Sequence, residues 1–408
     1  FRSYVDSVDW AVSVVGASAD QITVTASVPS AQSTNWTLGG TTTVTTDALG
    51  AATFSGLTAT NLSTTAFTTA SILFTPSTGV ATITSTPVFT VPAPATKLVV
   101  TGTGTQTAGG SQTVTVTAKD ASGNTVTTYS GAKTITFSGA ASSINPVTAP
   151  TVAGTNFGTG TSMTFTAGVA SATMILYQAE SATVNASDGT INSNTGGTLN
   201  VTVCSSTMTK LAVSLASPQI NGTAFTGTNT LTAQDAYGNT ATGFDASANN
   251  VTVTNSLGGT VTGLGSGGTN VLNQAGDFTS GVANLTTDGM IYTGTSGAGT
   301  FTFTPATGTA VTSSSVTINA GAATKLVVTG TGTQTAGGSQ TVTVTAQDAN
   351  GNTATTYTGA KTITFSGANA SPSPATTPTV AGTNFGTGTS MTFTAGVASA
   401  TMILYKAE

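Results

Sequence analysis

The sequence predicts an all-β protein made of tandem antiparallel β-sandwich modules. Short runs alternate polar and apolar residues, as in QTVTVTAKD, where Val114 and Val116 alternate with threonine. This period of two is typical of a strand with one buried face. Threonine, valine and isoleucine, whose branched side chains fit a pleated sheet, are abundant throughout the chain. A block that opens with Thr-Lys-Leu also occurs three times, with its lysine at Lys97, Lys210 and Lys325.

The spacing of the repeated block sets the expected domain frame. The three lysines lie 113 and 115 residues apart, which is the length of a whole β-sandwich and far longer than a solenoid repeat. The segments 95–180 and 323–408 match without gaps at 75 of 86 positions, as a recent duplication would. We therefore predict four modules, at 1–94, 95–207, 208–322 and 323–408.

Each strand of the second repeat is predicted from a short local pattern. KTITFSG places Ile135 and Phe137 on one face, and the runs SMTFTAG, SATMILYQ and SATVNASDG follow it. Clusters of Gly, Ser, Asn and Asp separate these runs and provide turn signals. No segment shows a capped helical stripe, so the sequence predicts little helix.

The motif Asp-x-x-Gly-Asn follows the second strand of each repeat, at 120–124, 235–239 and 348–352. An aspartate can accept hydrogen bonds from amides of its own turn, and glycine three residues later allows a positive φ. The motif is therefore interpreted as a turn of fixed geometry. The alternative is calcium bound at Asp120, Asp235 and Asp348, although one carboxylate per copy is a poor ligand set for an ion that takes six to eight oxygens.

With these motifs in hand, the repeats resemble the bacterial Ig-like modules of surface proteins such as adhesin stalks, S-layer-type proteins and filament subunits. The resemblance lies in KLVV…TVTVTAKDASGNTVTTYSGAKTITFSG, in GVASATMILYQAESATVNASDGT and in TDALGAATFSGLTATN. It implies two-sheet Ig-like sandwiches stacked outside the cell. The expected function is that of an exported structural protein in a surface layer, filament or stalk, without catalytic residues or cofactors.

The fourth module departs from this pattern. It stops at Glu408, where the second module continues with SATVNASDGTINSNTGGTLNVTV. One strand at least, and two by this comparison, are therefore expected to be missing, which exposes backbone groups and core side chains. Either the sequence is a fragment of a longer protein, or a neighbouring subunit donates the strand and so builds a homopolymer.

Composition excludes several classes of function. The net charge is −5 and no basic cluster occurs, which argues against nucleic-acid binding. No apolar run approaches the roughly 20 residues of a membrane span. The chain has no histidine and one cysteine, so the usual general base and zinc ligands are missing and an enzyme is not expected. The chain begins with Phe1, which fits either a cleaved export signal or a shortened sequence.

The polar faces of the expected strands carry threonine and serine where other domains carry Lys and Glu. Only 5% of residues are charged, so solubility is expected to come from attached glycans or from packing against other subunits. Asn-x-Ser/Thr sequons make glycosylation a hypothesis. The candidate acceptors are Asn35, Asn61, Asn185, Asn200, Asn221, Asn250, Asn284 and Asn369.

An adhesin or carbohydrate-binding protein is the alternative function. Sugar sites generally use exposed aromatic rings, and the two tryptophans of the chain, Trp10 and Trp36, both lie in the first module. A binding region would therefore be expected there. The other interpretation of both residues is core packing.

Overall fold

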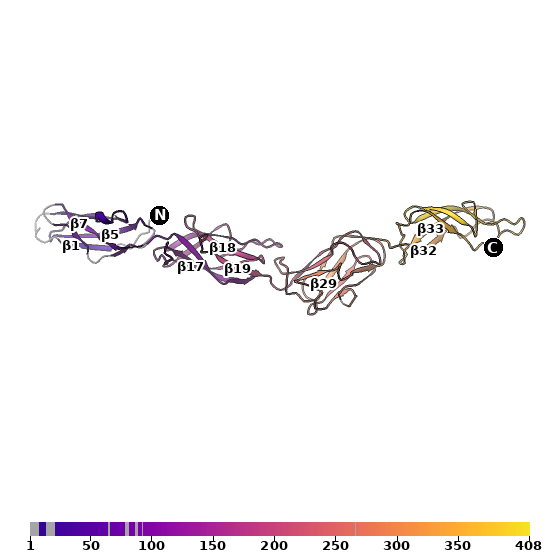
Figure 1. Ribbon diagram of the computed structural model, residues 1–408, viewed down its shortest axis with the longest axis horizontal. Helices are drawn as coiled ribbons and strands as arrows, with labels where there is room; N and C mark the ends of the chain where they lie inside the picture. Colours follow the sequence, from indigo (N-terminus) through magenta and orange to yellow (C-terminus); the bar gives the residue numbers. More distant parts are fainter. Residues whose placement is uncertain are drawn as a thin grey trace. The chain divides into compact units, whose positions relative to one another are not determined.

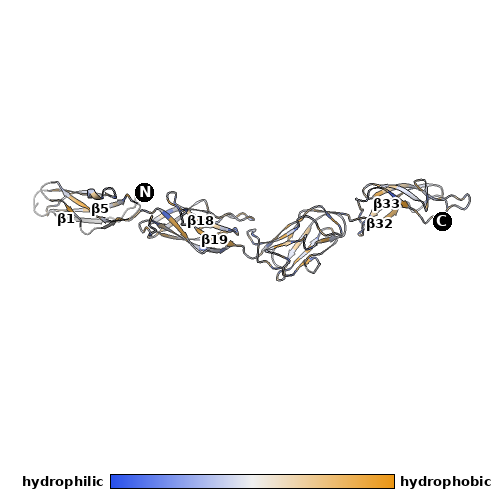
Figure 2. Cartoon of the chain, viewed as in Figure 1, coloured by the Kyte–Doolittle hydropathy of each residue, from blue (hydrophilic) through white to orange (hydrophobic). Residues whose placement is uncertain are grey.

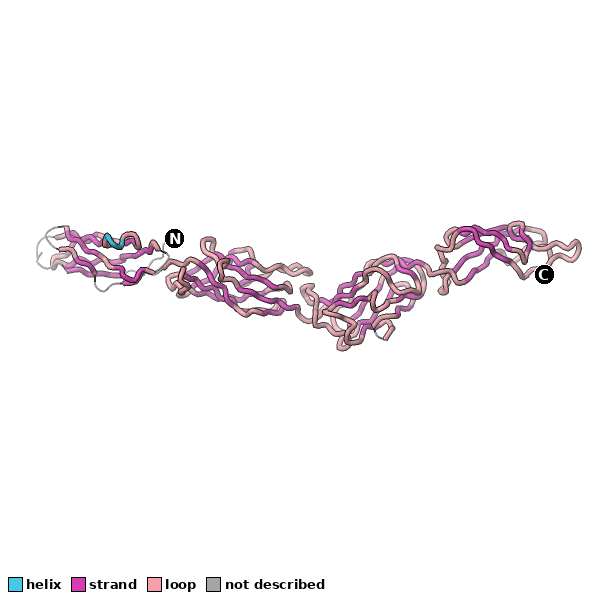
Figure 3. Tube along the Cα trace, viewed as in Figure 1, coloured by secondary structure: helices cyan, strands magenta, loops and turns pink. Residues whose placement is uncertain are grey.

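The computed structural model describes residues 8–13, 21–63, 66–77, 81–85, 89–91, 93–265 and 267–408. Strands dominate, and the 3-10 turn Ser30–Gln32 is the one helical element of the part described (Figures 1 and 3). The predicted fold class is confirmed: the chain is a tandem array of Ig-like antiparallel β-sandwiches with four separate hydrophobic cores. It divides into two compact units, Phe1–Ser206 with Tyr237–Asn239, and Thr207–Ala236 with Thr240–Glu408.

The first sandwich packs its sheets around Trp36, Phe54 and Phe74. Phe54 and Phe74 contact each other with ring centroids 5.2 Å apart. Its sheets have the orders β1-β5-β3, β4-β2-β7-β8 and β6-β9. The strands are β1 (Val8–Ser13), β2 (Thr23–Ser27), β3 (Trp36–Gly39), β4 (Thr43–Thr45), β5 (Ala51–Asn61), β6 (Phe67–Ala70), β7 (Leu73–Pro76), β8 (Ile83–Thr84) and β9 (Phe89–Val91).

The second sandwich is the most regular, with two five-stranded sheets of orders β10-β12-β17-β14-β15 and β11-β19-β18-β13-β16. Leu98, Val116 and Phe137 lie in the core between the sheets. The strands are β10 (Lys97–Thr101), β11 (Thr105–Thr107), β12 (Ser111–Lys119), β13 (Gly131–Ser138), β14 (Thr151–Val152), β15 (Thr155–Asn156), β16 (Gly160–Phe165), β17 (Val169–Ile175), β18 (Ser181–Ser187) and β19 (Leu199–Cys204).

The third sandwich contains shorter strands and more loops around Tyr292, Phe301 and Phe303. Its sheets have the orders β20-β22-β26, β21-β31-β28, β25-β23-β29-β30 and β24-β27. The strands are β20 (Lys210–Ser214), β21 (Gln219–Ile220), β22 (Thr230–Gln234), β23 (Val251–Asn255), β24 (Thr260–Thr262), β25 (Val271–Leu272), β26 (Val282–Asn284), β27 (Ile291–Thr293), β28 (Gly297–Gly299), β29 (Phe301–Pro305), β30 (Val311–Thr312) and β31 (Val316–Asn319).

The fourth sandwich has one complete sheet, β32-β33-β38-β35-β36, and a second sheet of two strands, β34-β37. Its core is smaller and centres on Val344, Met391 and Phe393. The strands are β32 (Lys325–Thr329), β33 (Ser339–Gln347), β34 (Gly359–Thr364), β35 (Thr379–Val380), β36 (Thr383–Asn384), β37 (Gly388–Phe393) and β38 (Val397–Ile403).

The alternation predicted from the sequence is the burial pattern of these strands. Along β12, Val114 and Val116 are buried whereas Thr113 lies at the surface and Thr115 is half-buried. Hydrophobic colour accordingly lies on strands such as β33 (Figure 2). No helix among the described residues is long and apolar enough to cross a bilayer.

Two pairings differ from a purely antiparallel sandwich. β11 pairs in parallel with β19, and β21 pairs in parallel with β31. The cause is that the first segment of the second and third sandwiches contributes to both sheets. In the second, β10 pairs with β12 in one sheet, and the chain then crosses so that β11 joins the other. The sequence contains no signal for this crossing, because the segment around Thr105 has few apolar residues.

Candidate functional surface

The open side of the fourth sandwich is the clearest candidate surface. In the second sandwich β13 pairs with both β16 and β18, and β18 continues to β19. In the fourth sandwich β34, the counterpart of β13, pairs with β37 only. The segments that correspond to β18 and β19 would come after Glu408, so residues 323–408 form neither strand.

The missing strands leave core positions open to solvent. Leu98 and Val100 of β10 are 0% and 2% exposed, whereas the matching Leu326 and Val328 of β32 are 41% and 54% exposed. Thr105–Thr107 form strand β11 against β19, but the matching residues 333–335 form no strand. We call this surface, lined by Leu326, Val328 and the free edge of β34, the open face. It offers apolar side chains together with backbone groups that lack a strand partner.

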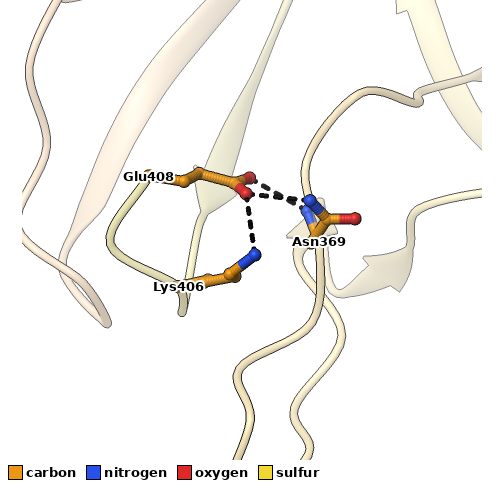
Figure 4. Close-up of polar contacts among 3 residues, drawn as sticks. All are labelled: Asn369, Lys406 and Glu408. Carbon is orange, nitrogen blue, oxygen red and sulfur yellow. Dashed lines mark hydrogen bonds and ion pairs between the residues drawn. The ribbon is translucent and has the colours of Figure 1, made fainter.

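The last residues of the chain are tied to the loop that follows β34. The Glu408 carboxylate accepts hydrogen bonds from the backbone N–H of Asn369 at 3.0 Å and from its Nδ2 at 2.9 Å, and it pairs with Lys406 Nζ at 3.4 Å (Figure 4). The backbone and side-chain hydrogen bonds from Asn369 lower the pKa of Glu408 below its usual value. Glu180 accepts from the Ala141 amide at the same place in the second sandwich. The matching glutamates Glu180 and Glu408 are therefore held by the same backbone amide position in the two copies.

The Asp-x-x-Gly-Asn motifs form the turns that the sequence predicts. Gly123, Gly238 and Gly351 have φ values of +87°, +85° and +87°. The Asp120 carboxylate accepts from the Asn124 backbone amide at 2.8 Å, and Asp348 does the same with Asn352 at 2.9 Å.

Two of the motif carboxylates, Asp120 and Asp348, are held by amide donors. Burial tends to raise the pKa of Asp120, but hydrogen bonds from Asn124, Ser122 and Gly123 outweigh it and lower the pKa. The pKa of Asp348 is lowered by the same kind of hydrogen bonds against the same effect of burial.

The fold does not bring further carboxylates to the calcium candidates Asp120, Asp235 and Asp348 to form a group of three in the described part of the chain. Asp235 is fully buried. Within the described ranges, no three His, Cys, Asp or Glu side chains lie close enough together to hold a metal ion. A cation at these turns would compete with the amide donors, so calcium has no part in the function proposed below.

The eight sequon asparagines divide by exposure. Asn61 and Asn221 are buried, and their Nδ2 atoms donate to the carbonyls of Val91 and Gly294. These two predictions are wrong for the folded chain, because an N-linked glycan needs an accessible nitrogen. Asn35 and Asn185 are half-buried, while Asn200, Asn250, Asn284 and Asn369 are exposed and stay candidates.

The tryptophans do not form an exposed aromatic surface. Trp36 is fully buried, and its indole N–H donates to Gln32 Oε1 at 3.2 Å. The ligand hypothesis for Trp36 is therefore wrong, since the ring fills the first core. Trp10 pairs with Phe54 in the sheet, and its side chain lies outside the described part.

Nothing in the described residues has the geometry of a catalytic site. A recess beside β23 and β24 is lined by valine, threonine, asparagine and glycine, which carry no titratable group. Asp288 is the carboxylate with the largest raised pKa, about 6, owing to burial and to the charge of Asp277. A half-buried pair of carboxylates without a base, nucleophile or recess beside it supports no reaction class.

Comparison with known proteins gives no family. No family model matches the chain, and no curated protein does. Among solved structures, invasin, titled a bacterial integrin-binding protein, shares 15% identity over 75% of this chain and 54% of its own, with a TM-score of 0.29. InvD of Yersinia pseudotuberculosis shares 18% identity over 76% of this chain and 83% of its own, with a TM-score of 0.31.

The surface layer protein SbsC, domains 4–9, shares 19% identity over 76% of this chain and 43% of its own, with a TM-score of 0.23. This chain thus spans about half the length of invasin and of this SbsC fragment. The function proposed below therefore depends on the features of this chain itself.

Proposed function

We propose that this protein is an exported structural component of a cell-surface assembly, in the form of a surface layer, filament or stalk. Its parts are four Ig-like modules with boundaries at 1–94, 95–207, 208–322 and 323–408. The four separate cores support this division. The low charge and the hydroxyl-rich outer faces suit surfaces that pack against other subunits or carry glycans.

The open face is the observation that carries the proposal. Its sequence is that of a face which, in the second sandwich, is closed by β18 and β19. The residues that close it there alternate along each strand: Ala182, Val184 and Ala186 of β18 are buried, as are Leu199, Val201 and Val203 of β19. A strand with this alternation supplies the missing hydrogen bonds and covers Leu326 and Val328. The partner we propose is a neighbouring subunit that contributes such a strand.

The experiment is assembly of the purified chain with and without a competing peptide. The peptide has the sequence of residues 181–204 with serine in place of Cys204, and its control carries serine at the six buried positions named above. Sedimentation and negative-stain electron microscopy should show concentration-dependent oligomers, which the peptide dissolves and the control leaves intact.

Each outcome decides a separate part of the proposal. Assemblies that persist in saturating peptide would contradict strand donation between subunits, but they would still be consistent with a structural role. A chain that stays monomeric at every concentration would overturn self-association.

A further inference from the structure

The asparagine of the Asp-x-x-Gly-Asn turn makes a contact beyond its own turn. In the second unit, Asn352 of the fourth sandwich donates from Nδ2 to the Gly294 carbonyl at 2.9 Å. Its Oδ1 accepts from the Ser296 amide at 2.8 Å. Gly294 and Ser296 lie between β27 and β28 of the third sandwich. One carboxamide therefore bridges two backbone groups, a carbonyl and the amide two residues later.

The same bridge occurs in the first unit. Asn239 donates from Nδ2 to the Tyr177 carbonyl at 2.8 Å, and its Oδ1 accepts from the Ala179 amide at 2.8 Å. The carbonyl and the amide are again two residues apart. An asparagine carboxamide thus makes the same pair of backbone hydrogen bonds to two segments with different sequences, Gly294–Ser296 and Tyr177–Ala179. A side chain needed only to close a turn would not repeat this external geometry.

Residues around Asn352 are arranged to hold it. Asp348 fixes the turn by accepting from Asn352 Nδ2 at 3.0 Å, and it also accepts from the amide of Gly321, in the segment that joins the third sandwich to the fourth. Asn350, which stands where the second repeat has Ser122, donates to Asn221 Oδ1 at 3.2 Å. Asn221 Oδ1 in turn accepts from the Gly294 amide. The contact is therefore a small polar network, with Asn352 at its centre.

We propose that Asn352 is a latch between consecutive modules, which fixes the fourth module to the Gly294–Ser296 segment of the third. Its partner surface is a backbone carbonyl and a backbone amide separated by one residue, presented at a loop of the third module, where the Gly294 carbonyl also accepts from Asn221 Nδ2. This assigns Asn352 a role in the rigidity of the second unit, which is independent of whether the protein assembles with other copies.

Asn124 provides a matched control within the same chain. Its backbone amide and its Nδ2 bond to Asp120 as those of Asn352 bond to Asp348. Its side chain has no hydrogen bond to another sandwich in the part of the chain described. Asn124→Ala therefore reports the loss of the turn bond alone, while Asn352→Ala loses the turn bond and the latch.

The test measures the distance between the third and fourth modules by double electron–electron resonance. Spin labels at Thr260→Cys and Thr392→Cys, both exposed, are placed in a Cys204→Ser background. The width of the distance distribution should at least double in Asn352→Ala and stay unchanged in Asn124→Ala. Hydrogen exchange at the Ser296 amide should become about tenfold faster in Asn352→Ala only, as expected for the loss of one hydrogen bond.

A second variant distinguishes the loss of the latch from a folding defect caused by Asn352→Ala. Asn352→Ser keeps a hydrogen-bonding group for the turn but is too short to bridge Gly294 and Ser296. It should give the broad distribution of the alanine variant. A distribution as narrow as that of the parent in a folded Asn352→Ser protein, with unchanged Ser296 exchange, would overturn the latch.

Discussion

Leu326 and Leu98 occupy the same position in two nearly identical segments, yet Leu98 is fully buried and Leu326 is 41% exposed. The surrounding strand pairs are the same, with Leu326 opposite Ala346 as Leu98 is opposite Ala118. The difference comes from β18 and β19, which cover the second sandwich and have no counterpart among residues 323–408. The residues that line the open face are the same as those in the second sandwich. Their exposure therefore depends on whether the covering strands are present.

Extending the chain past Glu408 with the sequence of residues 181–204, with serine for Cys204, should stabilise the fourth sandwich. Leu326 and Val328 alone would gain about 2 kcal/mol, because each would bury roughly half of its side chain. Calorimetry of the extended and parent chains measures the change. The matched extension with serine at the apolar positions should leave the melting temperature of the fourth sandwich unchanged. Equal melting temperatures for the two extended chains would contradict the prediction.

Tyr129→Phe should destabilise the second sandwich by about 1.5 kcal/mol, the value of a hydrogen bond to a charged acceptor. The Tyr129 hydroxyl donates to Asp188 Oδ2 at 2.6 Å. Burial and the bond to Asp188 raise the pKa of Tyr129, so the hydroxyl stays protonated through the physiological range. Urea unfolding measures the loss.

Tyr357→Phe is the control for that substitution. Tyr357 packs on Phe393 at 4.8 Å as Tyr129 packs on Phe165 at 4.9 Å, and each ring lies below a lysine ammonium. Residues 323–408 contain no equivalent of Asp188. The free energy of unfolding of that sandwich should therefore change by less than about 0.5 kcal/mol. Equal losses in the two sandwiches would show that ring packing, and not the hydrogen bond, is responsible.

Asp348→Asn should cost the fourth sandwich about 2 kcal/mol at pH 7, because the buried carboxylate is an acceptor for several amides. Since the pKa of Asp348 is lowered in the folded chain, its contribution is present above the ordinary value of 3.8 and is lost as the pH falls further. Urea midpoints of parent and variant should therefore converge in acid. A difference that stays constant down to pH 2 would contradict this assignment.

Asp288→Asn should act in the opposite sense on the third sandwich. Burial and the charge of Asp277 raise the pKa of Asp288 to about 6, and its Oδ2 has no hydrogen-bond partner. The folded state therefore binds a proton that the unfolded chain releases near 3.8, so stability is highest in acid and falls as the pH rises through about 6.

The variant should stabilise the protein at pH 7 by on the order of 1 kcal/mol, a value reduced for solvent screening of a half-buried side chain. The gain should vanish below pH 4. Asp245→Asn is the control, because the backbone hydrogen bond from Ser247 lowers the pKa of Asp245 and removing it should not stabilise the protein. A gain from Asp288→Asn that is the same at pH 4 and pH 7 would exclude the charge as its cause.

Much of the fold could be predicted from the sequence, because its signals are local. The run QTVTVTAKD became β12 (Ser111–Lys119), and the turn glycine Gly123 has the predicted positive φ. The open face followed from comparing two copies of one segment. These features depend on residues within a few positions of each other, or on internal repetition.

What could not be predicted depends on contacts between distant residues. Asn352 was interpreted as a turn residue, and its bond to Gly294 joins residues 58 positions apart, with nothing in either sequence to indicate it. The crossing of β11 to the other sheet has no hydrophobic signal. Trp36 was a candidate ligand residue because tryptophan suits both a sugar site and a core, and only the packing of the first sandwich decides between them.

The near identity of 95–180 and 323–408 also bears on how the chain reaches its fold. Both segments offer the same template to an incoming strand, but residues 1–408 contain one pair to fill it, Ser181–Ser187 and Leu199–Cys204. During synthesis segment 95–180 emerges first and pairs with the two strands that follow it directly in the sequence. When a polypeptide of residues 1–408 is completely denatured, that order is lost and the two templates compete. Its refolding should therefore yield two topological isomers that differ in which copy is closed.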